Sequence, residues 1–293
     1  MLTRSTRYLI FFQYIGTKYS GVMKAPTHQA VKGVQNYLEE AVRRLKPVNV
    51  VSLYISSRTD TGVHALGNSA HFDLQRQNGK TPFAEDVLVN ALNFHLRPEP
   101  IRVTRAYRVS DVFHARFQAV ARTYVYRLVT GVHHPSSMPL TDANLCWVLR
   151  HDGLDVGAMC DAAALLVGTH NFSSFRALNS EAAFKDPVKT LDRASMEPGN
   201  AFVHRHFHRD IQFWELTFKS RSFLYKQVRR MTGALVAVGQ GKMSVSGVKE
   251  LLEVQDSKAY PQNFTAPPDG LFLTRVDYHH SDLQPPAASC SLL

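Results

Sequence analysis

The stretch Val48–Leu74, VNVVSLYISSRTDTGVHALGNSAHFDL, decides the fold expected for the first part of the chain. It begins with an apolar run typical of a strand, and it ends in NSAHFDL, which alternates apolar and polar residues as a half-buried strand does. Between these runs Arg58 and Asp60 lie two residues apart, close to Gly62, which frees the backbone for a positive φ. A turn in which Asp60 bonds to nearby backbone amides is the purely structural interpretation of this charged pair.

The periodicity on either side of this stretch predicts a β-α-β-β-α-β order for the first half of the chain. Val31, Val34, Leu38, Val42 and Leu45 recur at helical spacing. A proline suits the first turn of a second expected helix. The expected elements are a strand at 8–14, a helix at 31–45, strands at 48–56 and 68–74, a helix at 82–96 and a strand at 101–107.

The same order recurs in the second half. The expected elements there are a strand at 123–129, a helix at 155–167, strands at 188–196 and 211–218, helices at 223–238 and 246–254, and a strand at 271–278. Two such units predict an α+β protein of two ferredoxin-like halves, at 1–110 and 111–280, with a disordered tail at 281–293. Joined edge to edge, the halves would form one continuous antiparallel sheet with helices on one face and a central basic cleft.

The composition indicates a nucleic-acid partner and a reducing environment. The 293 residues carry a formal net charge of +10, and a charge of this size attracts polyanions. A basic protein that is merely soluble is the alternative. Cys146, Cys160 and Cys290 are far apart and include no C-x-x-C pair, so neither a disulfide framework nor a zinc site is expected. Reduced thiols fit an intracellular protein, and no apolar run approaches the roughly 20 residues that span a bilayer.

Arginines lie among aromatic residues in FHARFQAVARTYVYRL, residues 113–128. On the expected strand Tyr124, Tyr126 and Leu128 share a face. A tyrosine between arginines can stack on a base while the cations hold phosphate. A core tyrosine with a polar tip is the alternative.

A second basic cluster opens the expected helix in SFLYKQVRRMTGAL, residues 222–235. It contains Lys226, Arg229 and Arg230, and Arg229 follows Val228 at the margin of the apolar stripe. A half-buried arginine needs an anion, which Asp60 could supply. A solvated charge cluster is the alternative. The alternating histidines of FVHRHFHRD, residues 202–210, fall in an expected hairpin loop, so no metal site is expected.

With these pieces placed, the sequence resembles the TruA-type tRNA pseudouridine synthases over most of its length, from Tyr8 to about Tyr278. The motif RTDTGVHA at 58–65 carries most of the resemblance. Further similar motifs follow in the family's order: GVQNYLEEAV at 33–42, FHARF at 113–117, ARTYVYRL at 121–128, GTHNFSSFRA at 168–177, DPVKTL at 186–191, SFLYKQVRRMTGAL at 222–235 and APPDGLFL at 266–273.

The resemblance implies a double ferredoxin-like fold and a role for five residues. Asp60 corresponds to the catalytic aspartate, and Arg58 to the arginine that displaces and holds the target nucleotide. Tyr124 corresponds to the tyrosine that stacks on the uracil, Arg229 to the arginine paired with the aspartate, and Leu271 to a leucine lining the pocket. The resemblance further implies a tRNA substrate, a homodimer, and chemistry without a metal or other cofactor.

The chain departs from the family pattern at three places. Thr61 replaces the usual alanine, YSGVMK at 19–24 lacks the G-W-Q of many members, and Asn171 replaces an aspartate. None of these changes removes a residue with an implied catalytic role. A non-catalytic RNA-binding protein on the same fold, acting on tRNA or another RNA, remains the competing interpretation.

The location expected is the mitochondrion, with the cytosol as the alternative. The first acidic residue is Glu39, and a basic N-terminus without acids can direct import into mitochondria. The same residues overlap the first expected strand, which weakens this indication.

Overall fold

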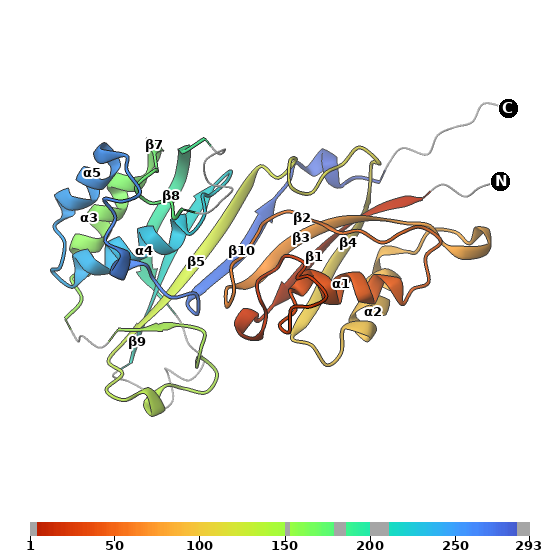
Figure 1. Cartoon of the computed structure of the whole chain (residues 1–293), viewed down its shortest axis with the longest axis horizontal. Helices are drawn as coiled ribbons and strands as arrows, with labels where there is room; N and C mark the ends of the chain where they lie inside the picture. The colour runs from red at the N-terminus through yellow and green to blue at the C-terminus, as the bar shows by residue number, and fades with distance from the viewer. Residues whose placement is uncertain (1–4, 150–152, 179–185, 200–210, 286–293) are drawn as a thin grey trace. The chain divides into compact units, whose positions relative to one another are not determined.

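The computed structural model describes residues 5–149, 153–178, 186–199 and 211–285 (Figure 1). Contacts divide the chain into two compact units. Unit 1 comprises Met1–Val120 and Leu273–Leu293, and unit 2 comprises Ala121–Phe272. Across the described ranges, no helix combines the length and apolar character needed to cross a membrane.

Unit 1 contains a twisted antiparallel sheet with two helices packed against each other (Figure 1). Strand β1 lies between β4 and β3, and β3 also pairs with β2 and with β10 (Leu271–Asp277). The elements are β1 (Thr6–Tyr14), α1 (Val34–Arg43), β2 (Tyr54–Ile55), β3 (His64–Leu74), α2 (Glu85–Leu96) and β4 (Ile101–Val109).

Strand β1 of unit 1 is apolar on both faces because both faces are covered. Tyr8 stacks near Phe72 of β3, and its hydroxyl donates to the carbonyl of Phe83, just before α2. On the opposite face Leu9 and Phe11 pack against the segment that follows β4, in a cluster with Val109, Phe113 and Ala115. A strand covered on both faces reads as a continuous apolar run, which explains YLIFFQY.

Unit 2 contains strands in the order β5-β9-β8-β7, all antiparallel, with the short β6 parallel to β5. Helix α3 packs against α4, α5 and β8. The elements are β5 (Ala121–Thr130), β6 (Trp147–Val148), α3 (Val156–Leu166), β7 (Gly168–Asn171), β8 (Val188–Pro198), β9 (Gln212–Ser220), α4 (Gln227–Gly239), α5 (Val245–Val254) and β10 (Leu271–Asp277).

Strand β10 belongs to both units. Just before it, Gly270 accepts a hydrogen bond from the amide of Arg127 on β5, within unit 2. From Leu273 onward the strand lies in unit 1, beside β3. The sequence interpretation gave this whole strand to the second half and placed the boundary near Ser110, whereas the division of contacts falls at Val120 and again at Leu273.

The α+β class predicted from sequence is confirmed, and most expected strands and helices are present. The prediction of a strand at 48–56 is wrong except at Tyr54 and Ile55, which form β2. The side chain of Asn49 bonds to the backbone of Asp73 and Gln75 and holds this segment outside the ladder. Strands β6 and β7 were not predicted, since two and four residues give no periodicity.

Two further expectations concern the ends of elements. The helix expected from 223 begins at Gln227, because Lys226 has a left-handed φ of 56°. The start of the tail expected to be disordered, 281–293, overlaps a short 3-10 helix, His280–Leu283, whose Leu283 packs on the cluster around Phe11. The continuous sheet and the central cleft involve both units and stay predictions.

Candidate active site

The loop between β2 and β3 carries the predicted catalytic pair in unit 1. Asp60 is half-buried, and Arg58 is exposed. The amide of Val63 donates to the carbonyl of Asp60 at 3.2 Å and closes the turn, and Gly62 has a φ of +80° as the sequence predicted. The turn is therefore closed by a hydrogen bond between backbone groups.

Hydrogen bonds fix this loop on both sides of the pair. The hydroxyls of Tyr14 and Thr59 lie 2.7 Å apart in a buried contact. The amide of Val22 donates to the carbonyl of Thr59 at 3.2 Å. The side chain of Asn68 donates to the carbonyl of Ser57 at 2.9 Å. Ser57 and Thr59, the two sequence neighbours of Arg58, are thus both held through their backbone carbonyls.

Two glycines allow another segment to lie directly against this loop. A Cβ at Gly16 would lie 2.0 Å from the carbonyl oxygen of Val63, and one at Gly21 would lie 2.7 Å from that of Thr59. Gly21 also has a φ of +103°, which L side chains rarely adopt. The amide of Gly16 donates to Nδ1 of His64 at 2.9 Å, which places the proton of a neutral ring on Nε2. The YSGVMK segment therefore contacts the loop through its backbone, at Gly21 and Val22. Its departure from the family pattern changes side chains and leaves this backbone contact intact.

Unit 2 carries the other predicted site residues. Tyr124 lies on β5, buried opposite Phe218, and its ring meets that of Phe223 edge to face at 5.2 Å. The buried Tyr126 and Leu128 follow at the alternate positions, as the sequence predicted. Leu271 is buried at the start of β10.

Arg229 and Arg230 are neighbours in sequence but have different environments. Arg229 is half-buried, and its Nε donates to the carbonyl of Ala266 at 2.7 Å, while its own carbonyl accepts from the Ala266 amide. Arg230 is buried, and burial lowers the pKa of its guanidinium. Its Nη1 donates to the carbonyls of Ser174, Arg176 and Ser257. The prediction of a solvated charge cluster is therefore wrong for Arg230, which ties two loops, one through Ser174 and Arg176 and the other through Ser257, to α4.

Arg127, in the aromatic and basic stretch, also has a structural partner. Its Nη2 lies 2.7 Å from the carboxylate of the buried Asp142, and its guanidinium lies over the ring of Phe213. This arginine is held within unit 2. Sequence reasoning did not find Asp142, because the acid lies fifteen positions away in a segment without periodicity.

The histidines at 204, 206 and 208 lie outside the described residues. Among the residues that are described, no group of three or more His, Cys, Asp or Glu side chains could hold a metal ion. Asn171, the third departure from the family pattern, donates to the side chain of Gln255 and accepts from the amide of Ser173. It therefore stabilises a turn in unit 2.

Comparison with known proteins finds relatives of one family over nearly the whole chain. A family model described as "tRNA pseudouridine synthase" matches residues 10–118 and 162–279. "tRNA pseudouridine synthase-like 1" of Xenopus laevis is 55% identical over 97% of this chain and 95% of its own length. The human protein of the same name is 51% identical over 98% of this chain and 93% of its own length. "tRNA pseudouridine synthase A" of Maricaulis maris is 39% identical over 93% of this chain and 98% of its own length.

The net charge of +10 on this α+β chain is typical of the class of proteins that bind nucleic acid. The matches define the group within that class: this chain belongs to the tRNA pseudouridine synthase family, whose members are isomerases. The family resemblance stated from RTDTGVHA is confirmed. Asp60, Arg58, Arg229 and Leu271 fall inside the matched spans, whereas Tyr124 falls between them.

Proposed function

We propose that this chain isomerises uridine to pseudouridine in tRNA, with Asp60 as the catalytic carboxylate. The observation that carries the proposal is the loop held by Tyr14, Val22 and Asn68 within a span that the family model matches. Catalysis gains from a reactive group whose backbone is fixed before the substrate arrives, because less freedom is lost on reaching the transition state. The names of the relatives supply the substrate, tRNA.

The reaction rearranges one nucleotide without any co-reactant. The N1–C1′ bond of uridine breaks, the base turns, and a C1′–C5 bond forms. The proton on C5 is lost and N1 gains one, so substrate and product have the same atoms and electrons. In this proposal the carboxylate of Asp60 either attacks the substrate or removes a proton from its ribose, and both routes remain open.

Four further residues bind the target nucleotide in this proposal. Extrusion of the uridine from its stack costs a few kcal/mol. A phosphate contact from the exposed Arg58 and stacking on Tyr124, worth roughly 1–3 kcal/mol per base, offset that cost. Leu271 lines the pocket, and Arg229 pairs with Asp60. Because Tyr124, Leu271 and Arg229 belong to unit 2 and Arg58 and Asp60 to unit 1, this proposal involves both units.

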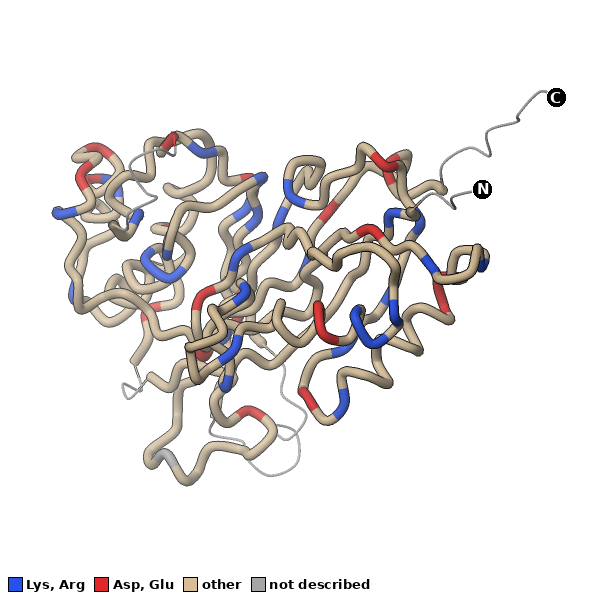
Figure 2. The backbone as a smooth tube through the Cα atoms, turned by 45° about the vertical axis from the view of Figure 1, so that its right-hand side comes forward, with Lys and Arg blue, Asp and Glu red and all other residues tan. Residues whose placement is uncertain are grey.

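The remaining RNA is held through its phosphates in this proposal. Figure 2 shows Lys and Arg residues distributed over the backbone of both units. Affinity for tRNA should therefore fall steeply as salt rises, since each phosphate contact releases counterions. A homodimer and a mitochondrial location also remain predictions, to be checked by the mass of the purified protein and by imaging of a C-terminal fusion.

The proposal is tested by Asp60→Asn, with Asp86→Asn on the exposed start of α2 as the matched control. Tritium at uridine C5 is released on isomerisation, so its release from labelled tRNA measures the reaction. We expect Asp60→Asn to lower the rate by at least about 10³-fold, the scale of a lost catalytic group, while the affinity for tRNA stays within about twofold. Normal tritium release by Asp60→Asn would reject the assignment. In a non-catalytic RNA-binding protein, loss of the carboxylate would instead tighten binding.

A further inference from the structure

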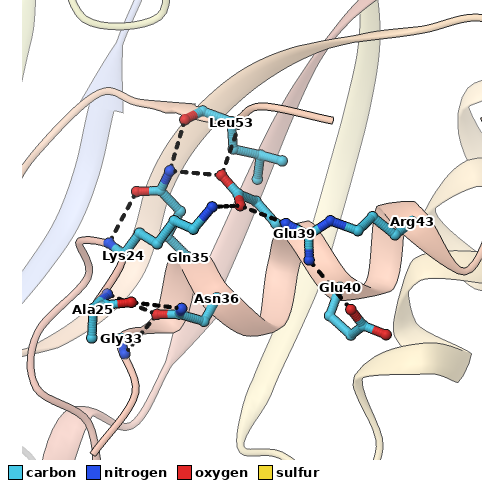
Figure 3. Close-up of polar contacts among 9 residues, drawn as sticks. All are labelled: Lys24, Ala25, Gly33, Gln35, Asn36, Glu39, Glu40, Arg43 and Leu53. Atoms are coloured by element: carbon cyan, nitrogen blue, oxygen red, sulfur yellow. Dashed lines mark hydrogen bonds and ion pairs between the residues drawn. The ribbon is translucent and has the colours of Figure 1, made fainter. Parts of the chain in front are cut away.

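Glu39 of α1 is a buried carboxylate at the centre of a polar network in unit 1 (Figure 3). Its side chain is 2% exposed and accepts hydrogen bonds from Lys24 Nζ at 2.8 Å, Arg43 Nη2 at 2.9 Å and Gln35 Nε2 at 3.0 Å. The amide of Leu53 adds a longer bond at 3.4 Å. Charges in such positions are unfavourable unless fully paired, so this carboxylate needs its whole set of donors.

The network joins two segments that are distant in sequence. One is residues 21–25, here called the strap, and the other is the chain at Leu53 that leads into β2. Gln35 contacts both, since its Oε1 accepts from the amide of Lys24 and its Nε2 donates to the carbonyl of Leu53. Asn36 adds a two-way bond with the backbone of Ala25 (Figure 3).

Both segments continue directly to the Asp60 loop. The strap is bonded to the first turn of α1, because the amides of Val34 and Gln35 donate to the carbonyls of Gly21 and Val22. From the strap the amide of Val22 donates to the carbonyl of Thr59, between Arg58 and Asp60. From Leu53 the chain passes through β2 into the loop itself. Glu39 and Gln35 are thus linked to the loop by two routes, one through the strap and one through β2.

We propose that Glu39 and Gln35 are positioning residues for the reaction, which hold the strap and the start of β2 so that the Asp60 loop keeps its catalytic geometry. The inference rests on the proposed role of Asp60. Neither residue touches the loop, so their effect reaches it through the backbone bond from Val22 to Thr59 and through β2. A displacement on the order of 1 Å at a reacting group can cost about 100-fold in rate.

The test compares Glu39→Gln and Lys24→Met with Glu40→Gln. Glu40 is the neighbouring carboxylate on α1, is exposed, and pairs only with Arg43 and Arg44 among the described ion pairs. Initial rates at saturating unmodified tRNA give kcat, and filter binding gives Kd. We expect Glu39→Gln to lower kcat by roughly 10- to 100-fold and Lys24→Met by roughly 3- to 10-fold, with Kd changed by less than about twofold. Glu40→Gln should match the wild type.

Lys24→Met guards against a variant that fails to fold, because Glu39 keeps its bond from Arg43. Lys24→Arg restores the cation and should recover kcat to within about twofold. A rise in Kd at unchanged kcat would make Lys24 an RNA contact and would overturn the proposal, as would wild-type kcat in Glu39→Gln. Asp60→Asn is assayed in parallel: if it stays active, the catalytic assignment fails, whereas an inactive Asp60→Asn beside a fully active Glu39→Gln refutes the positioning role alone.

Discussion

The two units hold their candidate site residues by different means. In unit 1 the Asp60 loop is held by hydrogen bonds, and the strand that follows it buries polar side chains. In unit 2 Arg229 lies on α4, and all the remaining residues of this helix are buried. The buried polar residues of β3 are His64, Asn68, Ser69 and His71.

This difference separates activity from stability. A loop held by single hydrogen bonds can shift when one of them is lost, while the rest of the unit stays folded. A residue on a packed helix keeps its place until the packing itself fails. Polar substitutions near the loop of unit 1 should therefore act mainly on the reaction, and those in the interior of unit 2 mainly on stability.

The largest expected effect is a loss of stability in unit 2 from Arg230→Met. The change removes the donor shared by the carbonyl of the buried Ser174 and those of the half-buried Arg176 and Ser257. We expect the free energy of unfolding to fall by roughly 3–5 kcal/mol, since unsatisfied buried groups cost about 1–3 kcal/mol each. Urea unfolding followed by circular dichroism measures this loss.

Arg229→Ala is the control for this substitution. It removes a neighbouring guanidinium that is only half-buried, so we expect a loss of stability below about 1 kcal/mol. Its rate of isomerisation should nevertheless fall by at least about tenfold if it pairs with the catalytic carboxylate. Equal losses of stability in Arg230→Met and Arg229→Ala would contradict the expected difference between these neighbours. Wild-type turnover in Arg229→Ala would reject the ion pair between Arg229 and Asp60.

The sequence predicts the burial of Arg229 better than that of Arg230, because apolar periodicity identifies only which face of a helix is buried. Arg229 follows Val228 at the margin of the stripe, and the structure leaves it half-buried. Arg230 is buried because three carbonyls from distant loops converge on it, and no local pattern reports such loops. Asp142, the partner of Arg127, was missed for the same reason.

In unit 1 the sequence predicts the position of the Asp60 loop but not what holds it. The alternation in NSAHFDL and the positive φ at Gly62 are local properties. The contacts of Tyr14, Val22 and Asn68 depend on how β1 and the strap lie against the loop. Gln35 and Glu39 did leave a signal, as two polar residues four positions apart on the expected helix.

The second expected effect is a loss of stability of unit 1 in acid, caused by His71. Burial lowers its pKa from about 6.5 to about 4, and its Nδ1 accepts from the amide of Ala115 at 3.1 Å. The unfolded chain therefore binds the proton first as the pH falls. The contribution of neutral His71 to the free energy of unfolding is fully present above about pH 6.5. It is lost as the pH falls toward 4, by roughly 2–3 kcal/mol. His114 and Arg7 nearby add to the shift, and Asp73 opposes it.

Urea unfolding at pH 7, 6 and 5 measures this loss, with His71→Gln beside the wild type. Carboxylates titrate in both proteins. The difference between the two proteins in the slope of the unfolding free energy against pH therefore isolates the contribution of His71. We expect a shallower slope for His71→Gln, and the same slope as the wild type for His28→Gln, an exposed histidine of the same unit. Identical slopes in all three proteins would contradict the neutral, buried imidazole.

The third expected effect, smaller than those of Arg230→Met and of acid, is a loss of stability from Tyr14→Phe, which is also the sharpest test of the comparison. The change removes the hydroxyl that lies 2.7 Å from Thr59 Oγ1 in a buried contact. The loss of stability should be about 1–2 kcal/mol, as for one buried hydrogen bond. Since Thr59 lies between Arg58 and Asp60, the rate of isomerisation should fall as well, by roughly tenfold.

Tyr8→Phe is the matched control on the same strand, because the buried Tyr8 donates to the carbonyl of Phe83 at 2.9 Å, a contact with no part in the loop. It should lose similar stability and keep the wild-type rate. If both variants lose activity in proportion to stability, the loop moves only when the unit unfolds, and the distinction between the units fails. If only Tyr14→Phe loses activity, one hydroxyl holds the loop in its reactive position, because the two substitutions remove the same group from the same strand.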